Sequence, residues 1–155
     1  MKIKANIMKG KIVLFTFFLI FTNQIVVSQA KNAPQSIISP TAIIRTYHTQ
    51  DELRGMQKGM LIELYIERTR VLVKTLPYVA LATKPGLTPT DIGIPMDSNK
   101  TKLQDGQTAA TNVFLDSTKE YQERLVPYAD TENIIAGILF YEGIIKSLHL
   151  FNEYK

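Results

Sequence analysis

Apolar residues recur every three or four positions over three long stretches of the chain, at about residues 49–76, 99–125 and 131–151. This spacing places them along one side of an α-helix, which turns once every 3.6 residues. The pattern predicts an all-α fold, an antiparallel up-down helical bundle of three long helices plus a shorter fourth element. Either the N-terminal segment or a Pro-rich connection would supply the fourth element.

Local signals predict where these helices begin and end. Thr49 and Glu52 have the spacing of a capping box, in which each side chain bonds to the backbone N–H of the other residue. Pro77 and Pro127 disfavour the α conformation just before them, so the first two helices should end there. Asp130 or the threonine after it should cap the third helix.

The first thirty residues have the layout of a secretory signal peptide. A cationic start is followed by an apolar run at 12–21 and by the small residues Ser28 and Ala30. A membrane-spanning helix needs about 20 apolar residues, whereas polar residues interrupt this run after about ten, which disfavours the alternative of a retained anchor. The sequence therefore predicts cleavage near Ala30, export to the periplasm or the medium, and no stable membrane anchor afterwards.

Cleavage would also change the charge balance. The whole chain has 18 Lys and Arg against 14 Asp and Glu, and four of the lysines lie in the leader. The remaining 14 cationic residues equal the acidic ones, so no basic surface remains for a nucleic-acid partner. The chain has no Cys, which excludes disulfides, thiol nucleophiles and thiolate metal sites.

After the leader, residues 31–39 are expected to be flexible and residues 40–155 to form the helical bundle domain. Ser39 and Pro40 favour a short helix through His48, although this segment fits an extended conformation equally well. Residues 84–98 hold three Pro and two Gly, with one helical turn near 88–91. This connection is longer than usual, so it should cross the bundle or serve a function.

Residues for catalysis or metal binding are few. His48 follows Arg45, and His149 follows Lys146, where a dimetal bundle would need a glutamate three residues earlier. His48 is expected to be a capping or surface imidazole and His149 a helix-face residue. The sequence therefore predicts no catalytic residue, no metal site and no cofactor.

Glu142 precedes Lys146 by four residues, which favours an ion pair on the helix surface. The alternative is a buried carboxylate that lines a pocket, and burial of an unpaired charge would be costly. Likewise, Glu63, Glu67, Arg70 and Lys74 are expected to form a solvated face.

The last stretch is apolar over much more than one stripe, which indicates central burial or contact with another chain. Its candidate interaction face comprises Phe140, Tyr141, Ile144 and Phe151. A second set of residues is expected to allow close helix packing, with a groove for a ligand or partner as the alternative: Gly55, Gly59, Gly137 and Gly143.

These patterns favour a non-enzymatic protein that acts through protein–protein contact or self-association. The alternative is a carrier of an apolar small molecule, bound between helices under the 84–98 connection. An enzyme ranks third, since a hydrolase would need one of the two histidines beside a hydroxyl nucleophile.

Overall fold

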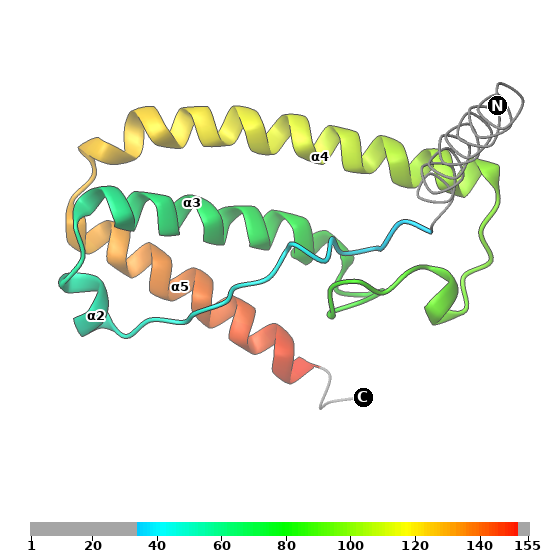
Figure 1. Cartoon of the computed structure of the whole chain (residues 1–155), viewed down its shortest axis with the longest axis horizontal. Coiled ribbons are helices and arrows are strands. Elements are labelled where there is room, and N and C mark those ends of the chain that lie inside the picture. Colours follow the sequence, from blue (N-terminus) through cyan, green and yellow to red (C-terminus); the bar gives the residue numbers. More distant parts are fainter. Residues whose placement is uncertain (1–33, 152–155) are drawn as a thin grey trace, which may run out of the picture. The chain divides into compact units, whose positions relative to one another are not determined.

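A computed structural model describes residues 34–151, and the predicted leader lies outside them. The chain divides after Pro34, and the unit from Gln35 onward is the one described below. Within it all regular elements are helical, which confirms the all-α class (Figure 1). The α-helices are α2 (Gln50–Arg54), α3 (Lys58–Thr75), α4 (Ser98–Leu125) and α5 (Thr131–Leu150).

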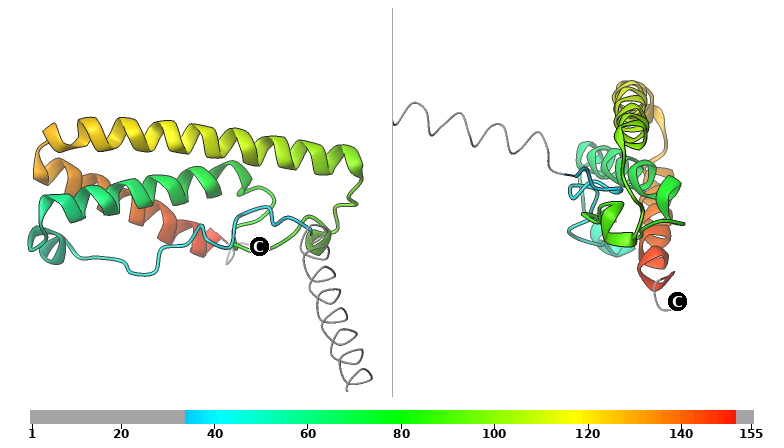
Figure 2. Two further views of the ribbon diagram at one scale, coloured as in Figure 1. Left: turned by 45° about the horizontal axis from the view of Figure 1, so that its top comes forward. Right: turned by 90° about the vertical axis from the view of Figure 1, so that its right-hand side faces the viewer.

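Helix α3 contacts both α4 and α5, and α5 runs obliquely to it (Figures 1 and 2). Short 3₁₀ helices follow α3 at Leu76–Tyr78 and α4 at Val126–Tyr128, each with a proline in its first turn. Both α-helices therefore end where the prolines predicted. The up-down order of a bundle stays a prediction.

The first long helix was expected to be continuous, and this prediction is wrong. The capping box is present: Thr49 N–H donates to Glu52 Oε2 at 2.7 Å, and Glu52 N–H donates to Thr49 Oγ1 at 3.3 Å. However, α2 ends at Gly55, and Gln57 has an extended conformation before α3 begins. The fourth helix is thus α2, which lies in neither of the two segments expected to supply it.

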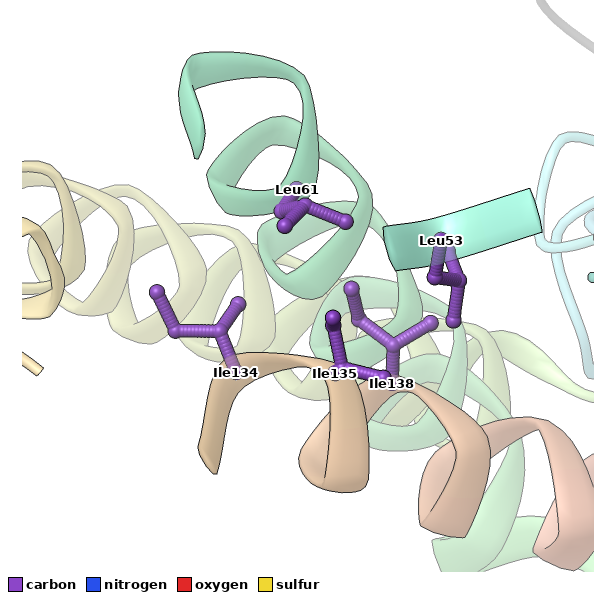
Figure 3. Packing of buried hydrophobic residues seen from close by; sticks show 5 residues of the cluster. All are labelled: Leu53, Leu61, Ile134, Ile135 and Ile138. Atoms are coloured by element: carbon purple, nitrogen blue, oxygen red, sulfur yellow. The ribbon is translucent and has the colours of Figure 1, made fainter. Parts of the chain in front are cut away.

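The break after α2 allows Leu53 to join the main core. Leu53 from α2 and Leu61 from α3 are fully buried, and both contact the isoleucines of α5 (Figure 3). These isoleucines are Ile134, Ile135 and Ile138. Full burial of such a side chain stabilises the fold by about 1.5–3 kcal/mol, so this cluster holds α2, α3 and α5 together.

The segment before α2 is packed, which corrects the expectation of a flexible leader through residue 39. Ile38 is fully buried with Ala42 and Ala82. After a turn at 40–41 the segment has no helix before α2, so the extended alternative is the one observed. It passes α3 and α5 before reaching α2 (Figure 1).

The 84–98 connection is tied to this N-terminal segment. Ile37 N–H donates to Leu87 O at 2.8 Å, and Gly86 N–H donates to Ile38 O at 2.9 Å. Gly86 has a φ of 90°, a left-handed conformation that favours glycine. The predicted helical turn is present at Thr90–Ile92, where Thr88 N–H donates to the Asp91 carboxylate.

Candidate functional site

The most buried charged groups of the described chain are Arg68 in α3 and Glu142 in α5. Arg68 Nη2 lies 2.9 Å from Glu142 Oε1, and Arg68 Nε lies 3.1 Å from the same oxygen. Their side chains are only 2% and 1% exposed. The expected surface pair of Glu142 with Lys146 is therefore wrong, because a buried cation from another helix neutralises the carboxylate.

The same two side chains hold the N-terminal segment. Arg68 Nη2 donates to Thr46 O at 2.7 Å, and His48 N–H donates to Glu142 Oε2 at 2.9 Å. Arg68 also pairs with the half-exposed carboxylate of Glu67, which the sequence assigned to the solvated face. The pair thus forms hydrogen bonds with backbone groups of the N-terminal segment that have no hydrogen-bond partner within a helix.

The ring of His48 completes this cluster and is largely buried, which corrects the expectation of a capping or surface imidazole. Its Nδ1 lies 3.2 Å from Glu142 Oε1 and 3.3 Å from Arg68 Nη2. A protonated Nδ1 donates to the carboxylate, whereas an unprotonated Nδ1 accepts from the guanidinium. His149 lies in α5, and its side chain is outside the described residues.

This arrangement is suited to holding segments together rather than to proton transfer with a substrate. Both oxygens of Glu142 are occupied by Arg68 and His48. The hydroxyl of Tyr47 is buried nearby, and burial, together with the charge of Glu142, raises its pKa. A hydroxyl nucleophile needs a lowered pKa or an adjacent base, and the environment of Tyr47 acts in the opposite direction.

A separate apolar pocket of about 260 Å³ lies under the 84–98 connection. Pro89, Ile94 and Met96 of that connection form one wall, and Leu103 of α4 forms another. The remaining lining includes Ile37, Tyr78 and Leu81. Apolar walls with a few polar groups are typical of small-molecule sites, although such sites usually measure about 300–1,000 Å³.

A second pocket of about 280 Å³ shares Ile37, Tyr78 and Thr108 with the first. Its lining is more polar and includes Lys74 of α3 and Asn112 of α4. Neither pocket is lined by Arg68, Glu142 or His48, so the buried ionic cluster lies apart from both.

The four residues of the predicted interaction face point in different directions. Phe140 is 65% exposed, and Phe151 is also exposed. Tyr141 and Ile144 are half-buried against the small core cluster of Val71, Leu72 and Ile145. The structure therefore brings two of the four side chains to the surface.

Tyr141 also raises the pKa of a tyrosine in α3. Its hydroxyl lies 3.1 Å from that of Tyr65, and this hydrogen bond, with burial, raises the pKa of Tyr65 to about 12. The ring centroids are 5.3 Å apart, so the pair links α3 and α5 by both ring contact and hydrogen bond.

Among the four glycines expected at close helix contacts, Gly137 has the tightest surroundings. A Cβ at Gly137 would lie 2.9 Å from Cε2 of Tyr65, whereas one at Gly59 or Gly143 would meet no atom within 4 Å. Gly55 is the C-cap of α2. The contact between α3 and α5 therefore depends on the absence of a side chain at Gly137, and Gly143 faces open space.

Arg68 was not among the functional residues expected from the sequence, although its position in the chain gives a signal. Arg68 lies seven residues after Leu61 and four before Leu72, so it falls on the apolar stripe of α3. Glu142 lies four residues after Ile138 and three before Ile145. One opposite charge on the buried stripe of each of two helices indicates a buried pair.

Across residues 34–151, no cluster of histidine and carboxylate side chains could hold a metal ion. The helices in this range lack the combination of length and hydropathy that a membrane crossing requires. No protein-family model, curated protein or solved structure matches the chain.

Proposed function

We propose that this protein is exported, loses its leader near Ala30, and acts non-enzymatically by associating with a second copy of itself in the periplasm or the medium. The proposed contact is the α5 outer face, which we define as Ala136, Phe140, Gly143, Ser147 and Phe151. All five residues are exposed and lie along one side of the helix.

The exposure of Phe140 is the observation that carries this proposal. A phenyl ring left 65% exposed on a helix that buries Ile134, Ile135 and Ile138 on another side gives α5 a second apolar surface. Association with a second copy would remove this ring, and the exposed ring of Phe151 further along the helix, from water. The small residues around Phe140 leave room for a partner, because a Cβ at Gly143 would meet no described atom within 4 Å outside its own stretch of helix.

A two-fold pairing fits this surface. In a symmetric dimer the same patch serves both copies, so a projection on one copy must match a hollow on the other. Phe140 supplies the projection, and the gap over Gly143 and Ser147 supplies the hollow. The proposed dimer places Gly143 near the two-fold axis, where the two α5 helices approach most closely.

Because the chain has no Cys, one introduced thiol tests this arrangement. Gly143→Cys should form an intermolecular disulfide on mild oxidation, since Cα atoms near a two-fold axis come within the roughly 4.4–6.8 Å that a disulfide requires. Gly59→Cys is the matched control, because Gly59 is also exposed and open but lies on α3. Equal cross-linking of the two variants would contradict the proposed face.

The apolar pocket favours a second candidate function, the carriage of an apolar small molecule under the 84–98 connection. Leu81 and Leu103 line this pocket and are exposed, so a bound molecule would cover apolar surface that the fold leaves in water. Native mass spectrometry after gentle purification should then show a bound small molecule, and a mass equal to that of the chain alone would contradict this candidate.

A further inference from the structure

We propose that the two adjoining pockets form one site for an anionic amphiphile, such as a medium-chain carboxylate, with its chain in the apolar pocket and its head group beside Lys74. This inference rests on the second candidate function and specifies the chemistry of the ligand. It does not depend on self-association through α5.

The first reason is that the two pockets adjoin. They share the lining residues Ile37, Tyr78 and Thr108, so a single ligand that occupied both would pass these three side chains. Each pocket alone, at about 280 and 260 Å³, is below the usual size of a small-molecule site, whereas the two volumes together would fall within that range.

The second reason is the change of polarity along this space. The pocket under the connection has walls of Ile94, Met96 and Leu103, and Leu103 is 74% exposed. The neighbouring pocket brings together Ser36, Lys74 and Asn112. An elongated molecule with one apolar end and one polar end matches both pockets. A wholly apolar molecule would leave the more polar pocket empty.

The third reason is the sign of the charge. Among residues 34–151, the charged side chains that line the two pockets are Lys100 in one and Lys74 in the other, and no carboxylate of this range lines either. Lys100 Nζ already donates to Pro95 O at 2.8 Å and to Asp97 Oδ2 at 2.9 Å. Lys74 forms no ion pair with any residue of the described range, so its ammonium group is available to an anion.

The neighbours of Lys74 suit a carboxylate. Asn112 supplies an amide that donates hydrogen bonds, and Thr111 supplies a hydroxyl. A hydrogen bond between a charged donor and a charged acceptor is stronger than one between neutral groups. Lys74 therefore selects the head group, and the leucines with Ile94 and Met96 hold the chain.

Isothermal titration of the purified protein with decanoate, decanol and decyltrimethylammonium, below their micelle-forming concentrations, tests the proposal. Decanoate should bind most tightly and the cationic amphiphile most weakly. Lys74→Gln should weaken decanoate binding by about tenfold and leave decanol binding unchanged, because only the charge contact is lost. Lys102→Gln, on α4 but outside both pockets, is the matched control and should change neither.

A second variant tests the apolar end. Leu103→Ser should weaken both decanoate and decanol, and its position on the exposed side of α4 leaves the core intact. Equal binding of decanoate and decanol, or decanoate binding unaffected by Lys74→Gln, would overturn the head-group assignment while the carrier function stands. Failure of all three amphiphiles to bind would overturn this inference, whereas the carrier function would be overturned only if native mass spectrometry also showed no bound molecule.

Discussion

Arg68 of α3 and Glu142 of α5 form an ion pair at 2.9 Å, with both side chains almost completely buried. The pair also binds Thr46 O and His48 N–H, so two helices and the extended segment meet at one point. Burial of both charges costs desolvation energy. The hydrogen bonds of the pair with each other and with the N-terminal segment offset this cost. Loss of either charge should therefore affect stability more than loss of a surface pair.

Glu142→Gln should lower the free energy of unfolding by about 3–5 kcal/mol, because it leaves the buried guanidinium of Arg68 without its counter-charge. Replacing both residues by apolar ones, Arg68→Met with Glu142→Leu, should cost less than the single change. Urea unfolding followed by circular dichroism measures both effects.

The exposed pair of Arg124 and Glu120 on α4 is the matched control for that experiment. Its N–O distance is 2.8 Å, close to that of the buried pair, but both side chains are mostly exposed. Glu120→Gln should therefore change the unfolding free energy by at most about 0.5 kcal/mol. If Glu120→Gln and Glu142→Gln lowered the free energy of unfolding by similar amounts, burial would not explain the contribution of the Arg68–Glu142 pair to stability.

Low pH should reduce the stabilisation that carboxylates provide at the N-termini of α2 and α4. Hydrogen bonds from Thr49 lower the pKa of Glu52, and hydrogen bonds from Lys100 lower that of Asp97. A carboxyl with a lowered folded-state pKa stabilises the fold fully above its unfolded-state pKa of about 4. This stabilisation is lost as the pH falls from there through the folded-state pKa.

Glu52→Gln should therefore make the loss of stability below about pH 4 shallower than in the original chain. Glu63→Gln is the control, since Glu63 is exposed on α3 and accepts no hydrogen bond from a described residue. Urea midpoints measured at several pH values give the slopes. Identical slopes for the original chain and Glu52→Gln would exclude a contribution from the capping box.

The two glycines of α5 should respond differently to alanine. At protein concentrations low enough for the chain to be monomeric, Gly143→Ala should stabilise the protein by up to about 1 kcal/mol, because alanine favours the helix and its Cβ would meet no described atom within 4 Å. Gly137→Ala places a Cβ 2.9 Å from the Tyr65 ring, so it should be less stable than Gly143→Ala by about 1–3 kcal/mol. Thermal unfolding measures the difference, and equal effects would show that the Tyr65 ring moves away freely.

The prediction of export is tested by the N-terminus of the protein recovered from the periplasm or the medium of its host. N-terminal sequencing should begin at Lys31, since the small residues Ser28 and Ala30 occupy the positions that a signal peptidase reads. Ala30→Arg should block this processing. A protein that begins at Met1 and stays with the cells would contradict export.

Much of the helical layout follows from local chemistry. The prolines at 77 and 127 end α3 and α4, and Asp97 and Asp130 cap α4 and α5, because these effects act within one turn of the chain. The break between α2 and α3 was missed, because a glycine inside a helical pattern is tolerated and does not by itself mark the end of a helix. Here the helix ends at Gly55 and does not continue into α3, because this break allows Leu53 to be buried against α5.

The candidate sites depend on contacts between distant parts of the chain, and a local pattern does not reveal those. Arg68 and Glu142 lie 74 residues apart, and only the packing of α3 on α5 brings them together. The sequence led to the prediction of an apolar ligand under the 84–98 connection, and residues of that connection line an apolar pocket, but binding of a ligand there stays a prediction. The more polar pocket beside it was not predicted, because Lys74 was assigned to a solvated face.

Sedimentation velocity over a wide range of protein concentration tests self-association through the α5 outer face most directly. The original chain should sediment as a dimer at high concentration, Gly143→Glu should sediment as a monomer, and Gly59→Glu should match the original chain. A strict monomer for the original chain at the highest concentration, or a dimer that survives Gly143→Glu, would contradict the account.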